Sequence, residues 1–266
     1  VFDGRKQSEQ GTLLPYTEQD VTCPINMYGK TKLEGEALIR SSGCNYLIFR
    51  TSWVYSDFGK NFLLTMLRLA KECDELKVVD DQWGAPCSAD WIANTSADIL
   101  KQMLSANSSE EWWKKHGGLY NLASAGTTSW CGFTEEIMRV ADTFSLLGKA
   151  APQVRGISSK EYPVKATRPV NSLLSTSLLS AHFDIQVPRW QKSVFDCLTA
   201  IANRTPLKPK IIPLRVMGDE RGSLVAVESQ QDIPFEIKRM YYIFGTKEGV
   251  ARGEHAHKNL KQLAVA

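Results

Sequence analysis

Tyr28 and Lys32 are the residues whose types and spacing best suit chemistry in this sequence. They stand one helical turn apart, so a helix would place both side chains on the same face. A free tyrosine, with a pKa of about 10, is a poor acid–base group at neutral pH, and a neighbouring ammonium favours its phenolate form. Such a pair can give a proton to a carbonyl oxygen while a cofactor delivers hydride to the carbon, because no side chain supplies hydride.

The spacing of Tyr28 and Lys32 also arises by chance in many proteins. On spacing alone, the more frequent arrangement is a surface tyrosine with a lysine one turn further along a helix. The catalytic interpretation therefore depends on the sequence that surrounds the pair.

A second pattern, His255-Ala256-His257, places two imidazoles near the end of the chain. Residues two apart on a strand face the same way, which suits either a metal pair or an acid–base pair. The spacing from Gly249 to His255 matches the first cupin motif, but that motif ends in glutamate and this chain has Gln262. The missing carboxylate weakens the metal interpretation, and a purely structural histidine pair remains an alternative.

The segments that must position Tyr28 and Lys32 alternate between strands and helices. Short apolar runs predict strands at 46–49, 76–79 and 119–122. Apolar residues at helical spacing and N-cap signals predict helices at 27–42, 61–73, 88–104, 129–144 and 190–202. This alternation predicts an α/β fold with a parallel sheet.

The character of the sequence changes near Arg204. Residues 205–210 hold two prolines and two lysines and are typical of a linker. Beyond them the helical period is lost, and strands are predicted at 211–216, 223–227, 237–244 and 260–265. We therefore expect an α/β domain over 1–204, a linker over 205–210 and an all-β unit over 211–266. Because the chain stops inside an apolar strand, we expect this β unit to be incomplete.

The composition is that of an ordinary globular protein. The 266 residues are 43% hydrophobic and 23% charged, and the formal net charge is +3. This charge requires neither a nucleic-acid nor a membrane partner, and no apolar run is long enough to span a bilayer. The six cysteines form no C-x-x-C pair, which fits buried thiols in a reducing cytoplasm.

Eight sequence motifs place Tyr28 and Lys32 in a family context. They are VFDG (1–4), PYTE (15–18), YGKTKLEGE (28–36), FRTSWVY (49–55), GKNF (59–62), VVDDQWGAP (78–86), GLYNLASAGTTSW (118–130) and RPVNSLL (168–174). In this order they resemble the dTDP-4-dehydrorhamnose reductases, members of the extended short-chain dehydrogenases. The resemblance covers the chain to about Arg204 and implies a Rossmann-like fold.

The resemblance implies roles for the residues around the pair. Tyr28 would be the proton donor and Lys32 its partner, with Lys32 also touching the nicotinamide ribose of NADPH or NADH. Arg50, Thr51 and Ser52 would line the nicotinamide side. The glycine-rich turn that cradles the cofactor phosphates is absent from this sequence. We therefore expect that the N-terminal part of the reductase domain is missing and that 1–204 is its C-terminal two-thirds.

Three residues are candidates for binding the sugar nucleotide. A Trp53 ring can stack on a hexose, and Asn61 and Arg168 could bind hydroxyls or diphosphate. The alternatives are a core aromatic for Trp53 and a surface charge for Arg168. Asp80 and Asp81 could suggest a metal, but adjacent carboxylates in a turn are usually solvated, so we expect no metal site.

The second part of the chain, after the linker, resembles a different family. DERGSLVAVE (219–228) and residues 233–265 are similar to the dTDP-4-keto-6-deoxyglucose 3,4-ketoisomerases, which are metal-free cupins. The resemblance implies a proton shuttle by His255 and His257 and phosphate binding by Arg221 and Arg252. It covers the N-terminal half of that cupin fold.

Both resemblances point to a dTDP-linked 4-keto-6-deoxy sugar. We expect a cytoplasmic homo-oligomer in which a reductase unit, using NADPH or NADH, is fused to a ketoisomerase-like unit. Another extended short-chain epimerase or dehydratase remains an alternative, although the latter normally has an acidic pair near the tyrosine. A non-catalytic, reductase-like binding or regulatory subunit is the other alternative.

Overall fold

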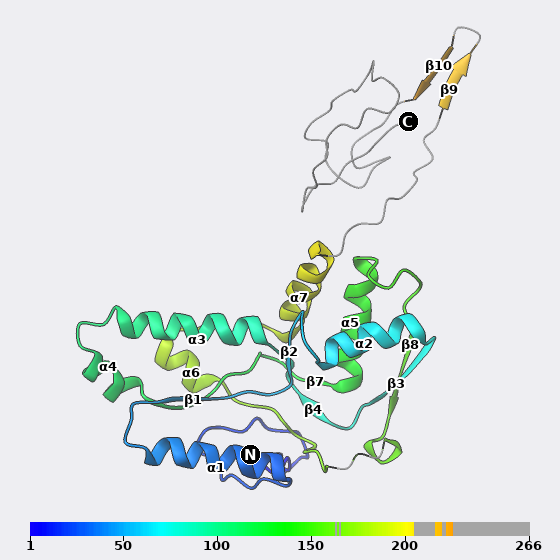
Figure 1. Ribbon diagram of the computed structural model, residues 1–266. Coiled ribbons are helices and arrows are strands. Elements are labelled where there is room, and N and C mark those ends of the chain that lie inside the picture. The colour runs from blue at the N-terminus through cyan, green and yellow to red at the C-terminus, as the bar shows by residue number, and fades with distance from the viewer. Residues whose placement is uncertain (163, 165, 205–215, 220–221, 226–266) are drawn as a thin grey trace. The chain divides into compact units, whose positions relative to one another are not determined.

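A computed structural model describes residues 1–162, 164, 166–204, 216–219 and 222–225 (Figure 1). The chain divides into two compact units, Val1–Arg204 and Thr205–Ala266.

The first unit alternates helices and short strands, as Figure 1 shows. The helices are α1 Met27–Ser41, α2 Phe62–Glu72, α3 Ala89–Leu104, α4 Ser109–His116, α5 Trp130–Thr143, α6 Ser177–Phe183, α7 Trp190–Arg204 and the 3₁₀ helix η1 Ser159–Glu161. The strands are β1 Leu47–Arg50, β2 Val54–Tyr55, β3 Glu75–Val79, β4 Trp83–Gly84, β5 Cys87–Ser88, β6 Gly118–Asn121, β7 Thr128–Ser129 and β8 Gln153–Ile157.

The strands of this unit pair two by two. β1 runs parallel to β6, β2 to β5 and β3 to β8, while β4 and β7 are antiparallel. The α/β class and the parallel pairing predicted from the sequence are therefore confirmed, although the described strands form separate pairs and no single broad sheet. Of the helices in the described part of the chain, none has the length and apolar character that crossing a bilayer requires.

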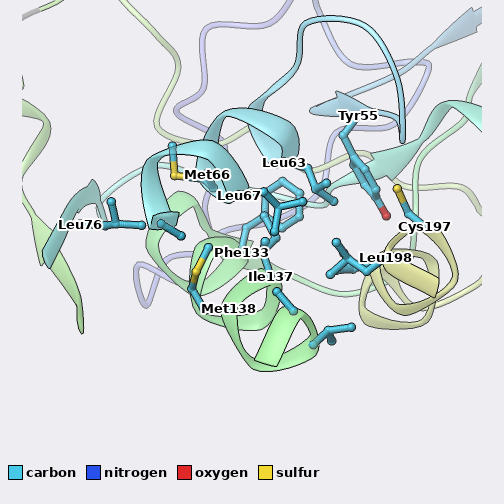
Figure 2. Close-up of a cluster of buried hydrophobic side chains, with 14 of the residues drawn as sticks. Tyr55, Leu63, Met66, Leu67, Leu76, Phe133, Ile137, Met138, Cys197 and Leu198 are labelled. Atoms are coloured by element: carbon cyan, nitrogen blue, oxygen red, sulfur yellow. The ribbon is translucent and has the colours of Figure 1, made fainter. Parts of the chain in front are cut away.

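One core lies where α2, α5 and α7 pack together beside β3 (Figure 2). Leu63, Phe133 and Leu198, one from each helix, are completely buried in it. Full burial of such a side chain contributes about 1.5–3 kcal/mol to the stability of the fold, relative to leaving the side chain exposed. Tyr55 also enters this core, and its position anchors the chain just after the turn that carries Trp53.

A second core joins α3, α4 and α6 to the β1–β6 pair. Its fully buried members include Ile99 of α3, Leu122 just after β6 and Leu179 of α6. Because β1 lies against this core, its carboxyl end is held in place, and the segment that follows it leads directly to Ser52 and Trp53.

The cysteines divide between the core and the surface. Cys87, Cys131 and Cys197 are buried as expected, whereas Cys23 and Cys44 are exposed. Burial raises the pKa of the Cys87 and Cys131 thiols to about 11 each, so these thiols are unreactive at neutral pH.

In the second unit, β9 Val216–Asp219 and β10 Gly222–Val225 form an antiparallel pair. The strand predicted at 223–227 overlaps β10, and the one predicted at 211–216 meets β9 only at Val216. The strands predicted at 237–244 and 260–265 and the linker at 205–210 lie outside the described residues.

Candidate functional site

A pocket of about 390 Å³ lies where the start of α1 meets the segment after β1 and residues 166–172. Tyr28, Trp53 and Arg168 all line it. The sequence singled out these three residues separately, from motifs far apart in the chain. The fold brings them to one cavity, which makes this pocket the candidate site.

Tyr28 stands in the first turn of α1, and local interactions fix that start. The Asn26 side chain caps the helix by accepting a hydrogen bond from Gly29 N at 2.8 Å, and its amide nitrogen donates to Thr167 O at 2.8 Å. Asn26 thus ties Tyr28 to the segment that carries Arg168. Tyr28 is 73% exposed, so its hydroxyl is free to meet a ligand.

Lys32 follows Tyr28 on the same face of α1, as the spacing predicted. Its ammonium nitrogen lies 5.5 Å from the centroid of the Tyr28 ring, a cation–π distance. The two side chains are therefore neighbours, and both are exposed.

Trp53 has a strained backbone and a sandwiched side chain. Its φ is 50°, a left-handed conformation that bulky residues rarely adopt and that costs about 1–3 kcal/mol. Its indole stacks on Trp130, with centroids 3.6 Å apart and planes 10° from parallel. A Cβ added to Gly84 would lie 2.6 Å from Cε2 of Trp53, so the Gly84 backbone packs against the fused-ring carbons.

Those contacts leave little of the Trp53 ring face free. The ring-fusion carbons carry no hydrogen and are reached only over a face of the indole. Trp130 already covers one face, so Gly84 lies on the other. Trp53 therefore presents its edge to the pocket, while Trp130 adds a second aromatic wall.

Arg50, expected on the nicotinamide side, is held in a buried ion pair. Its Nε and Nη2 donate to the two carboxylate oxygens of Glu36 at 2.9 and 2.7 Å, and its guanidinium lies 5.0 Å from the Phe2 ring centroid. This pair joins α1 to the end of β1. The assignment of Arg50 to the cofactor side stays a prediction. In the structure, its side chain links α1, which carries Tyr28, to the strand that leads to Trp53.

Thr51 and Ser52 follow Arg50 toward the pocket. Thr51 is exposed, and the Ser52 hydroxyl is buried without a hydrogen-bond partner among the described residues. An unpartnered buried hydroxyl is costly unless a ligand or water satisfies it. Neither Thr51 nor Ser52 is among the residues that line the pocket, so their assignment to the nicotinamide side stays a prediction.

Asn61 serves as the N-cap of α2. Its side-chain oxygen accepts from Leu64 N at 3.1 Å, and its amide nitrogen donates to Ser56 O and Phe58 O. Asn61 is not among the residues that line the pocket. Its role as a sugar ligand stays a prediction, while the observed hydrogen bonds are those of a structural cap.

Arg168 lines the pocket from the segment that packs on the N-terminal motif. Gly4 has a φ of 79°, and a Cβ on it would meet Pro169 at 2.5 Å. Asn171, almost wholly buried, donates to Lys6 O and Leu14 O. The motifs at 1–4 and 168–174 therefore pack on each other and fix where the exposed Arg168 emerges.

The carboxylates of Asp80 and Asp81 accept hydrogen bonds from other residues of the same chain. Asp80 accepts a hydrogen bond from the Ser129 hydroxyl, and Asp81 accepts from the hydroxyls of Ser158 and Ser159 and from Ser159 N. Partial burial alone would raise the pKa of Asp81, but these hydrogen bonds together outweigh it and lower the pKa below 3.8. Both residues brace the turn before β4.

Four polar or aromatic pocket residues escaped prediction from the sequence. They are Asn26, Gln82, Trp130 and Ser172. Gln82, Trp130 and Ser172 lie inside the motifs that resemble the reductase family, which indicated that these residues matter but not what they do. Arg221, Arg252, His255 and His257 lie outside the described residues.

Comparison with known proteins finds a matching family model for each part of the chain. Residues 1–203 match the RmlD substrate binding domain model, and residues 207–266 match the FdtA model, described as WxcM-like, C-terminal. The second match agrees with the ketoisomerase-type cupin expected from the sequence.

Individual relatives agree with the first match. The dTDP-4-dehydrorhamnose reductase of Burkholderia thailandensis is 44% identical over 202 residues, which are 74% of this chain and 64% of that protein. The crystal structure of a Clostridium acetobutylicum dTDP-4-dehydrorhamnose reductase is 33% identical with a TM-score of 0.63, covering 76% of this chain and 62% of that one.

A third relative carries a bound cofactor. The Bacillus anthracis dTDP-4-dehydrorhamnose reductase, solved in complex with NADP, is 29% identical with a TM-score of 0.59 and covers 75% of this chain and 62% of that one. The chain thus spans less than two thirds of the length of the relatives it matches here.

Proposed function

Residues 1–203 belong to the RmlD substrate binding domain family, and on that premise we propose that the pocket binds a dTDP-linked 4-keto-6-deoxyhexose for reduction. The observation that carries the proposal is the meeting of Tyr28, Trp53 and Arg168 in one cavity of about 390 Å³. A cavity of this size, with aromatic walls and a few polar groups, suits a small ligand such as a sugar.

The proposed reaction converts the C4 ketone of dTDP-4-dehydrorhamnose to the alcohol. The Tyr28 hydroxyl gives its proton to the carbonyl oxygen, and Lys32 beside it compensates the charge left on the phenolate. Arg168 offers the diphosphate a guanidinium able to make paired hydrogen bonds. Trp53 and Trp130 exclude water from one side of the sugar.

The cofactor, NADPH or NADH, supplies the hydride when bound. The chain's own residues fit its nicotinamide end in part. Lys32 and Thr51 are exposed, so both have groups able to hold it, whereas the unpartnered Ser52 hydroxyl is enclosed by the protein in the described region. Arg50 keeps two of its nitrogens on Glu36 and contributes mainly by position.

The proposal is tested in the complete protein, by replacing the Tyr28 hydroxyl and following NADPH oxidation that depends on dTDP-4-dehydrorhamnose. Tyr28→Phe should lower the rate by at least about 100-fold, because the proton donor is lost. Tyr46→Phe removes a hydroxyl outside the pocket and should keep the wild-type rate. Equal rates for Tyr28→Phe and wild type would overturn the assignment.

For residues 207–266 we propose sugar 3,4-ketoisomerisation, supported by the match to the FdtA model. His255 and His257 would move the proton between neighbouring sugar carbons, with Arg221 and Arg252 holding phosphate. His257→Asn should abolish isomerisation of dTDP-4-keto-6-deoxyglucose and leave NADPH oxidation by the first unit unchanged. Full isomerisation by the variant would refute the role of His257.

A further inference from the structure

Gln82 is a buried polar residue that the proposed chemistry leaves unused. It is 7% exposed and lines the pocket together with Tyr28 and Trp53. Within the described part of the chain, its side-chain amide makes no hydrogen bond, although buried amides normally do. Its polar atoms also remain accessible from the pocket, since they are not among the fully enclosed unpartnered atoms.

The backbone on both sides of Gln82 is fixed. Before it, Asp81 is held by Ser158 and Ser159 through its carboxylate. After it, Trp83 N donates to Val170 O at 2.7 Å, and Trp83 O accepts from Ser172 N at 2.8 Å. The Gln82 amide is therefore presented to the pocket from a rigid turn, so little conformational freedom would be lost when it binds a ligand.

The chemistry of the amide narrows what it can bind. A neutral amide offers both donors and an acceptor, which match the hydroxyls of a sugar ring. A diphosphate is better matched by the guanidinium of Arg168, which lines the same pocket. Gln82 thus suits the neutral, hydroxyl-bearing part of a ligand, and Arg168 suits its anionic part.

We propose that Gln82 determines sugar specificity by hydrogen-bonding a hydroxyl of the hexose whose C4 carbonyl meets Tyr28. This role rests on the proposed function of the pocket. A site whose buried polar group is satisfied only by the right hydroxyl binds sugars that lack it more weakly, because the amide is then left unpaired.

The test is calorimetric titration of the full chain with dTDP-L-rhamnose and with dTDP. Gln82→Met keeps the length of the side chain and removes its hydrogen-bonding groups. The variant should raise the dissociation constant for dTDP-L-rhamnose about tenfold, the value of one hydrogen bond, and leave that for dTDP unchanged. Gln191→Met, the same change at an exposed site on α7, should change neither.

Gln82→Asn provides a second variant if Gln82→Met does not fold, which a thermal unfolding curve would reveal. It keeps an amide but withdraws it by one methylene, and it should show the same selective loss for the sugar. Unchanged binding of dTDP-L-rhamnose by both variants would overturn the role of Gln82 alone. Failure of the wild-type chain to bind dTDP-L-rhamnose would instead overturn the proposed function, and the sugar assignment with it.

Discussion

Trp53 and Trp130 stack face to face in the pocket, with ring centroids 3.6 Å apart. Trp53 adopts a left-handed backbone to reach this position, and Gly84 supports its other face. Antiparallel pairing of β4 with β7 places Gly84 opposite Thr128, two residues before Trp130. One aromatic wall of the site is therefore built by three separate segments and depends on a glycine that leaves room for a ring.

Gly84→Ala should disturb this wall. The new Cβ would lie 2.6 Å from Cε2 of Trp53, so the indole must move, at a cost of about 1–3 kcal/mol in stability. Urea unfolding measures that loss, and titration with dTDP-L-rhamnose should show weaker binding. The control is Gly35→Ala on α1, where a Cβ meets nothing within 4 Å; it should raise helix stability by about 1 kcal/mol. Equal stabilities of Gly84→Ala and wild type would refute the packing described.

Glu36→Gln should destabilise the first unit strongly. The Glu36–Arg50 pair is about nine-tenths buried, and removing its negative partner leaves a guanidinium in the interior. Loss of one member of a buried pair costs about 3–5 kcal/mol. Glu72→Gln breaks the exposed Arg68–Glu72 pair and should cost less than about 1 kcal/mol. Similar losses for the two variants, measured by urea unfolding, would contradict the buried position of Glu36.

The hydrogen bonds to the Asp81 carboxylate should make the stability of the first unit depend on pH in the acidic range. Because the folded pKa of Asp81 lies below its ordinary 3.8, the unfolded chain binds its proton more readily. The stabilisation is complete above that ordinary value and is lost as pH falls through the lower folded pKa. Asp81→Asn should therefore differ most from wild type near neutral pH, and the difference should shrink below about pH 4.

Unfolding midpoints measured across this pH range check the prediction. Asp142→Asn removes an exposed carboxylate that lacks such hydrogen bonds in the described structure, and it serves as the matched control. A stability difference between Asp81→Asn and wild type that stays constant down to strong acid would rule out the linkage.

Much of the fold could be predicted because its signals are local. The helical spacing of Tyr28 and Lys32 lies on α1, which ends at Ser41, and Ser129 caps α5 as its position indicated. Asn61 carried the same kind of signal, an asparagine before an apolar helical run, and a capping role could have been expected for it. Helix α4 was missed although Ser108 caps it and charges of the favourable sign occupy both its ends.

The site itself could be predicted only in part, since its remaining members depend on contacts between distant segments. Glu36 and Arg50 meet only in the folded chain, and no local sequence pattern predicts their pairing. Trp130 joins Trp53 through the pairing of β4 with β7. Gln82 lies between Asp81 and Trp83, whose side chains draw more attention in the sequence. Its candidate role rests on its burial without a hydrogen-bond partner in the described structure, which cannot be seen in a sequence.

The most direct test of the central claim is a crystal structure of the chain bound to dTDP-L-rhamnose. We predict that the hexose occupies the pocket beside Trp53 and Trp130, with its C4 hydroxyl within hydrogen-bond distance of the Tyr28 hydroxyl. We also predict that Arg168 contacts the diphosphate. A sugar bound elsewhere, or bound here with C4 turned away from Tyr28, would contradict the assignment of this pocket as the site of keto-sugar reduction.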